Sequence, residues 1–439
     1  MSILGGPLLE DAEIEELLRK YPRFKGALPH EARLWTEAEL ETYLASGGQR
    51  KPADLSDKKS VPLNCGLLTK ARLKLAELKV ESATSEYVSY CRHRQQRSNF
   101  CSLPDAASCS PVQRVRQVSG VLTQPVTLVP KRGHDPIWRG WGMSFWKEAC
   151  GLEYCNCRTR WPAFEHDEPG IDGICIESGL TEYLEYMLVV ELQDPACMED
   201  QAMAFPRLQV GDFCPFITSC SRFFRDHYHA WSPGVEDLTL RWCQIYAAIF
   251  EQDPLLQLAQ FYRLHFGVIG AVSRLHKANH QASEWLLQLE GQRLFFLFPP
   301  EDGENLYELQ GGYDESRSDG SFGFAASCSE VNVFFPSQKR HPLFSKCNVQ
   351  VSLLGEGKTL VIPPGWWWCA VCTQPSVTMH HTYWGFENRL GFVDTLWAPF
   401  DSQQTSVDAR NSMRPAFAEL REALRKDDGR QDLEQLLGH

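Results

Sequence analysis

The chain has 439 residues, 43% of them hydrophobic, and a formal net charge of −12 at pH 7. A chain of this length can bury a large core in two or three domains. The acidic balance argues against a general nucleic-acid binder, which usually presents a basic face. No apolar run of about 18 residues is present, so we expect no membrane span, and the acidic N-terminus does not resemble a secretory signal.

Cysteines are frequent but lack the spacing of a disulfide framework. The chain has 16 of them, and reduced, buried thiols are typical of proteins inside the cell. We therefore expect an intracellular protein, cytoplasmic or nuclear. Cys155 with Cys157, and Cys369 with Cys372, are spaced like zinc half-sites, but neither pair has a clear second pair.

Residues 1–90 are predicted to form a helical N-terminal region. Segments 8–21 and 68–81 are amphipathic at helical spacing. Segment 36–44 begins with a Thr that can cap a helix, followed three residues later by Glu. Residues 91–118 carry Ser, Cys, Pro and Arg without a clear period, and we interpret them as a linker.

Residues 119–400 are predicted to form one domain that is mainly β-sheet with helical additions. Segment 138–151 is predicted to be a helix followed by a turn, and segment 178–193 a helix that continues into a strand. The clearest strands are short, alternating or apolar, and bounded by Gly and Pro; they are 285–291, 292–300, 348–354, 358–364, 366–372 and 376–384. Such a series favours an antiparallel barrel or sandwich. Residues 401–439 are predicted to be a helical C-terminal extension.

The strand region resembles the jumonji C (JmjC) and cupin-like oxygenase family, nearest the branch of arginine-demethylase and lysyl-hydroxylase type. The motifs that carry the resemblance are ordered and suitably spaced; they are His276, Trp285, Gly291, Phe298-Pro299, Pro336, Pro342-Leu343-Phe344 and Pro363-Pro364-Gly365-Trp366-Trp367. The resemblance is strongest over 270–385. It implies a double-stranded β-helix, the barrel of cupins and jelly rolls.

The resemblance also implies an Fe(II) site made of a His-x-Asp/Glu pair and a distal His, which leaves room for 2-oxoglutarate and oxygen. Here His276 stands at the first ligand position, Ala278 at the carboxylate position and Trp368 at the distal His position. Alanine has no donor atom, and the indole nitrogen carries a proton and cannot bind a metal. Only His276 remains as a metal ligand, so we expect no cofactor; an active enzyme would need Fe(II) and 2-oxoglutarate.

The cosubstrate positions implied by the resemblance also differ from the family pattern. Arg293 stands where the related branch has a Lys for the distal carboxylate of 2-oxoglutarate, and His380 where it has a Thr. Arginine binds carboxylates with a planar fork. We therefore predict a pocket that contains His276, Arg293 and His380, with Trp285 and Trp368 in its wall and Trp368 filling the space of the metal.

Several metal-binding alternatives remain open, although a residual pocket of hydrogen-bonded polar groups is favoured over all of them. A halide can replace the carboxylate in iron halogenases, but those enzymes keep the distal His. His280 lies four residues from His276, and His380 is a further candidate partner of His276. His227 and His229 would share one face of a strand, for which a loop or surface role is favoured.

Three functional hypotheses follow from these residues. The favoured one is a non-catalytic or divergent member of the family that binds or scaffolds a partner. The alternative is an active 2-oxoglutarate-dependent hydroxylase or demethylase with a non-standard metal site. The third is an adaptor whose N-terminal helices bind the partner. In each case we expect a protein partner or protein substrate, and neither a membrane nor a nucleic acid.

Overall fold

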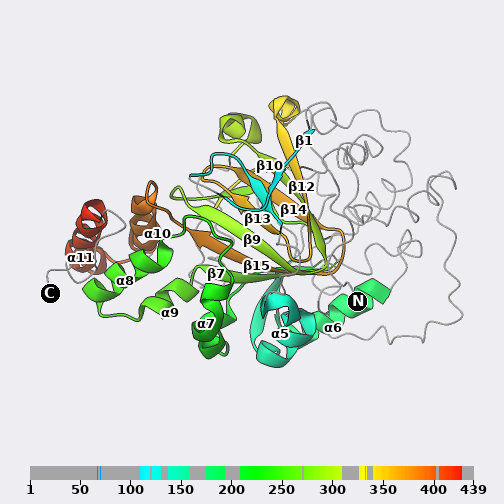
Figure 1. Ribbon diagram of the computed structural model, residues 1–439, viewed down its shortest axis with the longest axis horizontal. Helices are drawn as coiled ribbons and strands as arrows, with labels where there is room; N and C mark the ends of the chain where they lie inside the picture. The colour runs from blue at the N-terminus through cyan, green and yellow to red at the C-terminus, as the bar shows by residue number, and fades with distance from the viewer. Residues whose placement is uncertain are drawn as a thin grey trace, which may run out of the picture.

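The computed structural model describes residues 67, 70, 109–118, 121–129, 137–158, 175–192, 208–268, 271–308, 326–331, 333, 340–401 and 405–427. Two sheets face each other in the described part of the chain, with helices on one side of the pair (Figure 1). The two sheets and the helices around them confirm the predicted class, mainly β with helical additions.

The first sheet has the strand order β1-β12-β10-β14-β8-β11. Its strands are β1 (Cys109–Pro111), β8 (His276–Ala278), β10 (Gln292–Phe298), β11 (Ala326–Cys328), β12 (Val349–Gly355) and β14 (Trp367–Cys372). The strands are antiparallel except for β1, which pairs with β12 in parallel.

The second sheet has the order β2-β3-β13-β9-β15-β7-β6-β4-β5. Its strands are β2 (Gln113–Val115), β3 (Val126–Leu128), β4 (Tyr154–Arg158), β5 (Cys175–Gly179), β6 (Gln209–Phe213), β7 (Tyr262–Gly267), β9 (Ser283–Glu290), β13 (Thr359–Ile362) and β15 (Ser376–Tyr383). Its centre, β13-β9-β15-β7, is antiparallel.

Alternation along each strand sorts side chains into the barrel interior and the outer faces. The interior holds one buried cluster, with Leu286 from β9, Leu360 and Ile362 from β13, and Phe295 and Trp368 from the opposite sheet. The strands that border it are buried on both faces, which explains why they read as nearly continuous apolar runs rather than as strict alternation.

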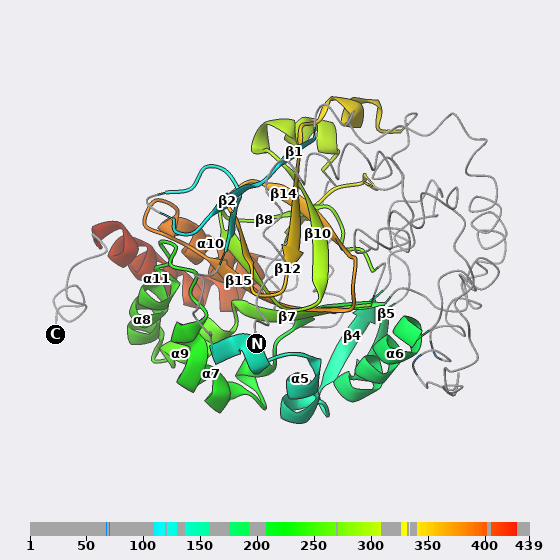
Figure 2. The same cartoon turned by 45° about the vertical axis from the view of Figure 1, so that its right-hand side comes forward.

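Helices cover the outer face of the second sheet (Figure 2). They are α5 (Met143–Cys150), α6 (Leu180–Leu192), α7 (Ser221–His227), α8 (Thr239–Phe250), α9 (Pro254–Ala259), α10 (Arg389–Asp401) and α11 (Val407–Lys426). Their buried residues share one cluster with outward side chains of β9 and β15 such as Trp285 and Met379. Because the cluster includes Phe417 and Leu420 of α11, the C-terminal helix belongs to the same core.

Short 3-10 helices lie on the outer face of the first sheet. Among them are η9 (Pro300–Leu306) and η11 (Pro342–Lys346), which pack on each other. Leu306 and Phe344 join Phe296, Phe298 and Trp367 in a separate buried cluster. The remaining short helices are η5 (Ile137–Gly140), η7 (Pro215–Ile217) and η8 (Tyr228–Ala230).

Each of the six predicted strands is present within a few residues of its predicted limits, and the predicted helix before Gly151 is α5. The prediction for segment 178–193 is wrong, because α6 runs unbroken from Leu180 to Leu192 after strand β5. The buried residues of α6 follow helical spacing; they are Leu180, Tyr183, Leu184, Met187 and Val190. The helical period therefore continues through the valine that suggested a strand.

The end of the predicted linker is part of the barrel. Residues 109–115 form β1 and β2, which pair with β12 and β3, so residues before position 119 belong to the sheets. The predicted N-terminal helices lie outside the described residues, apart from positions 67 and 70. In the described part of the chain no helix has the length and apolar character that crossing a membrane requires.

Candidate functional site

His276 and Trp368 face each other across β8 and β14. They are direct partners in the strand register, and their ring centroids lie 4.2 Å apart. Trp368 is fully buried and also contacts Phe295, with 5.7 Å between the ring centroids. The indole therefore fills the space beside the imidazole.

A buried carboxylate holds the indole of Trp368 in place. Its Nε1–H donates to Glu284 Oε2 at 2.7 Å, and His380 Nε2 donates to Glu284 Oε1 at 2.9 Å. Glu284 comes from β9 and His380 from β15, so three strands contribute to one hydrogen-bonded chain. Both carboxylate oxygens are occupied, as burial of an ionised group requires.

These contacts keep Glu284 ionised although it is buried. Burial alone would raise the pKa of its carboxyl group. The hydrogen bond and charge of His380, the charge of His276 and the hydrogen bond from Trp368 outweigh burial and hold the pKa below its usual value.

A second polar group lies deeper in the interior, where Arg293 of β10 approaches β7 and β15. Arg293 is 3% exposed, and its Nε donates to Ser376 Oγ at 2.8 Å. The Nη2 atom of Arg293 is buried and has no hydrogen-bond acceptor among the described residues. The Nε2 atom of His265 is also buried and has no hydrogen-bond partner among them. A Cβ on Gly267 would lie 2.3 Å from Cys372 Sγ and 3.4 Å from Arg293 Nη2, so the glycine leaves room for the thiol that packs beside the guanidinium.

His265 links Arg293 to the Glu284 group. Its ring lies 5.0 Å from that of His380, centroid to centroid. Burial, together with the charges of His380 and Arg293, lowers the pKa of His265 well below its usual value. The interior therefore combines a neutral imidazole with a buried guanidinium that lacks a carboxylate partner among the described residues.

Comparison with known proteins agrees with this architecture. Residues 245–388 match the family of the cupin-like domain. The chain carries a JmjC-like cupin domain. HSPB1-associated protein 1 of Rattus norvegicus is 31% identical over 121 residues, which cover 28% of this chain and 23% of that protein.

Other relatives match over stretches of comparable length. HSPB1-associated protein 1 of Homo sapiens is 31% identical over 121 residues, 28% of this chain and 22% of that protein. Lysine-specific demethylase 8 of Xenopus tropicalis is 31% identical over 102 residues, 23% of this chain and 20% of that protein. The matched segments thus span less than a quarter of these relatives.

The JmjC resemblance implies Fe(II), and the residues at the three ligand positions do not fit it. Ala278 offers no donor atom, and the indole nitrogen of Trp368 donates its proton to Glu284. His276 Nδ1 lies 2.6 Å from the carbonyl oxygen of Arg274. No group of three or more His, Cys, Asp or Glu in the described ranges is arranged to hold a metal ion.

The structure brings most of the predicted site residues together in the cupin barrel. Trp368 and His380 bind Glu284, His276 packs on Trp368, and His265 packs on His380. Arg293 lies on the interior face of β10, the face that also carries Phe295. Trp285 is not with them: it lies on the opposite face of β9, where its ring packs against those of Tyr262 and His381. The tryptophan therefore belongs to the core beneath the helices.

The alternative metal ligands lie elsewhere. The strand that a metal pair of His227 and His229 would need is absent from this described segment: His227 ends α7 and contacts Trp141 and Phe223, and His229 is in η8. The aromatic packing of this segment favours helical turns. His280 has a φ of 53°, in the turn before β9.

The two cysteine pairs also occupy strands. Cys155 and Cys157 lie on one face of β4 with 3.9 Å between their sulfurs. Cys369 and Cys372 face opposite sides of β14: Cys369 joins the cluster under the 3-10 helices, and Cys372 contacts Ser376 in the interior. Cys369 and Cys372 therefore cannot bind one metal ion together, because they lie on opposite faces of the strand.

Glu284 and His265 are site residues that sequence reasoning missed. Glu284 directly precedes Trp285, which carries the family resemblance, and it is a charged residue inside an otherwise apolar strand. The available signal was alternation, because Glu284, Gln288 and Glu290 are polar at even positions of β9.

Proposed function

We propose that this JmjC-like cupin protein does not carry out the iron-dependent reaction of its family and acts as a binding or scaffold protein. The supporting observation is the hydrogen bond from Trp368 to Glu284. A metal could bind beside His276 only if the Trp368 indole moved out of its buried position. The indole would then lose its hydrogen bond to the Glu284 carboxylate. Neither Ala278 nor Trp368 would supply a ligand in return.

We infer that the interior retains a preference for small anions through Arg293. Its Nη2 has no acceptor among the described residues, and a buried guanidinium is a strong partner for a carboxylate. Ser376 orients the guanidinium through Nε. His380 is engaged by Glu284, so we assign the anion to Arg293 and give His380 a supporting role.

We infer a protein partner for the scaffold role, inside the cell. Two observations support this proposal: some relatives are named as proteins associated with HSPB1, and the chain carries a net charge of −12, which suits a basic partner.

An active dioxygenase with a non-standard metal site is the second candidate. It is favoured by one observation, the buried carboxylate of Glu284 near two imidazoles, His276 and His380. Glu284 would then replace Ala278 as the hard oxygen ligand. This arrangement requires the Trp368 indole to move away from Glu284.

Metal analysis of the purified full chain, combined with oxygen-dependent 2-oxoglutarate turnover, separates the two candidates. We expect substoichiometric iron and no turnover. The double variant Ala278→Asp/Trp368→His should gain iron binding, because it restores the family's ligand types. Stoichiometric iron with turnover in the unaltered chain would establish the enzyme instead.

Ligand-dependent thermal unfolding in the presence of a chelator tests the anion site. Succinate or 2-oxoglutarate should raise the melting temperature with increasing concentration, as expected for a ligand that binds only the folded state. Arg293→Met should abolish the response, while Arg222→Met, at an exposed position, should keep it. An unchanged response in Arg293→Met would exclude Arg293 as the anion partner.

A further inference from the structure

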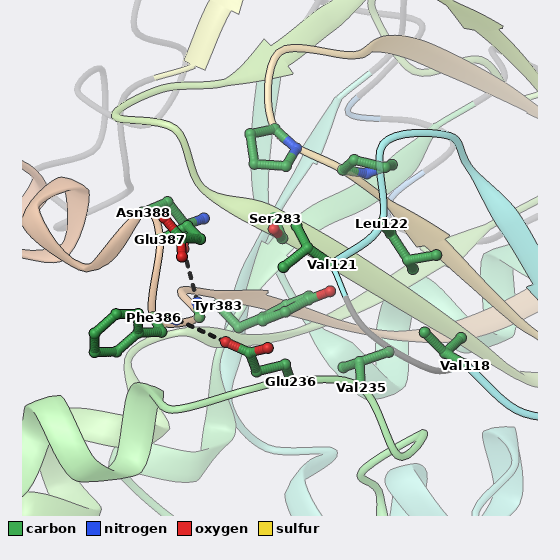
Figure 3. A pocket seen from close by; sticks show the side chains of 13 residues that line it. Val118, Val121, Leu122, Val235, Glu236, Ser283, Tyr383, Phe386, Glu387 and Asn388 are labelled. Carbon is green, nitrogen blue, oxygen red and sulfur yellow. Dashed lines mark hydrogen bonds between the residues drawn. The ribbon is translucent and has the colours of Figure 1, made fainter. Parts of the chain in front are cut away.

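A pocket lies on the side of β9 and β15 that faces away from the barrel interior (Figure 3). Ser283 and Tyr383, the paired end residues of the two strands, line it. Their neighbours Glu284 and Thr382 face the interior, since side chains alternate along a strand. The pocket is therefore separate from the site around Trp368.

The walls of the pocket are mainly aliphatic. They come from the segment before β3, from a loop before α8 and from the Pro-Pro turn after β13; the residues are Val118, Val121, Leu122, Val235, Pro363 and Pro364. The free volume is about 90 Å³. A buried water needs roughly 10–15 Å³ measured this way, so the pocket admits a few waters or one slender side chain.

The charged side chains that line the pocket are both acidic. Glu236 and Glu387 border it, and none of its lining residues is Lys, Arg or His. Glu236 Oε1 accepts a hydrogen bond from the backbone N–H of Phe386 at 3.0 Å, which fixes the carboxylate. Among the described residues neither glutamate has a basic partner within ion-pair distance; the nearest described cation at the pocket edge is Arg389, which packs on the ring of Phe386.

Aromatic rings and hydroxyl groups complete the pocket. Figure 3 shows the Tyr383 ring between Glu236 and Ser283. Burial raises the pKa of Tyr383, although a hydrogen bond with Ser283 opposes the change, so the phenol stays neutral. The face of Tyr383 attracts cations, whereas the Phe386 ring already packs against the guanidinium of Arg389, 4.2 Å from its centroid. Aliphatic walls, an aromatic face and carboxylates together suit a cation at the end of an alkyl stem.

We propose that this pocket binds an aliphatic ammonium group of the size of a lysine side chain. The stem lies against the valines and prolines, and the ammonium group contacts Glu236 and the ring of Tyr383. Two sources share this chemistry: a free alkylamine, and a lysine in a polypeptide. The proposal does not depend on the proposed function, because it uses the outer face of the sheet.

Calorimetric titration of the full chain tests the proposal with three probes: n-butylamine, the blocked tripeptide Ala-Lys-Ala, and the same tripeptide with an acetylated lysine amine. We expect binding of the ammonium probes and none of the acetylated one. Glu236→Gln should weaken binding about fivefold to tenfold, as expected for loss of a partly exposed charged contact. The Gln carbonyl can still accept from Phe386, so folding should be preserved.

Glu356→Gln is the matched control. Glu356 is exposed in the turn before β13, at the opposite end of that strand from the pocket, and its substitution should leave affinity unchanged. A tripeptide that binds more tightly than butylamine identifies a polypeptide source, and equal affinities identify a free amine. Absence of ammonium binding, equal binding of the acetylated probe, or equal weakening in both variants would overturn the proposal.

Discussion

At the scale of single residues, Glu284 is the centre of the interior. Its two oxygens accept from Trp368 and His380, which keeps its pKa below the usual value although burial acts in the other direction. A carboxyl group with a lowered pKa stabilises the folded state above its ordinary pKa. That contribution disappears as the pH falls through the folded-state value.

Trp368→Phe should reveal this contribution. The change keeps most of the ring but removes the donor to a buried carboxylate, so we expect a loss of about 1–3 kcal/mol in unfolding free energy at pH 7. The difference in unfolding free energy from the unaltered chain should narrow as the pH falls below 4.5, the ordinary pKa of this carboxyl group. Denaturant titrations between pH 3 and 7 would measure it.

Trp366→Phe provides the control for that series. The Trp366 indole donates to the neutral carbonyl of Thr123 at 3.1 Å, so its loss should be similar at each pH. Parallel pH profiles for the two variants would contradict the role given to Glu284.

The ligand positions were the part of the site open to prediction from sequence. Ala278 and Trp368 stand at fixed distances from recognisable motifs, so their chemistry follows from the residue type. Glu284 and His265 gained their roles through pairing of β9, β15 and β7, which brings together residues nearly 100 positions apart, such as Glu284 and His380. No local pattern specifies that contact.

At the scale of elements, the tightest connection joins β9 to β10. Gly291 has a φ of 74°, in the left-handed region that favours glycine. A Cβ there would lie 1.9 Å from the carbonyl oxygen of Pro375. The connection from one sheet to the other at Gly291 and the turn before β15 therefore approach each other closely because Gly291 has no side chain.

Gly291→Ala should destabilise the protein by at least about 2 kcal/mol, since it combines an unfavourable φ with a clash against backbone. Gly303→Ala, whose Cβ would meet Trp367 Nε1 at an ordinary 3.7 Å, should have little effect. Chemical unfolding of both variants would measure the difference. Equal stability of the two would mean that the turn relaxes.

Local sequence patterns predicted where strands and helices lie better than they predicted which strands pair with each other. Strands β9, β10 and β12 to β15 have short apolar or alternating runs bounded by Gly and Pro, which makes them visible in sequence. Strands β1 and β2 were missed because each has three residues and is stabilised by parallel pairing with distant strands. Helix α6 was mistaken at its end because Val189 and Val190 are typical of strands.

At the scale of the whole molecule, the C-terminal helix is tied to the helices that cover the sheet. Asp427, at the end of α11, has a fully buried side chain and accepts two hydrogen bonds from Arg241 of α8. Phe417 packs between Phe250 and Trp397. The chain beyond residue 400 therefore contributes to the stability of the cupin domain.

Asp427→Asn should cost about 2–4 kcal/mol, because it leaves a guanidinium at a buried site without its charged partner. Asp401→Asn should cost almost nothing, since Asp401 is 65% exposed and lies 3.8 Å from Arg410. Thermal and denaturant unfolding would compare the two. A similar effect for both would show that α11 is held by its apolar face alone.

Consecutive residues of β9 take part in two separate sites. Ser283 lines the outer pocket, and Glu284 accepts the hydrogen bond of the Trp368 indole. The same strand can therefore diverge on one side while it is conserved on the other. A lineage that lost the metal ligands inside the barrel would still inherit the pocket outside it, without compensating mutations. Substitutions on the interior face of β9 thus leave the lining of the outer pocket in place.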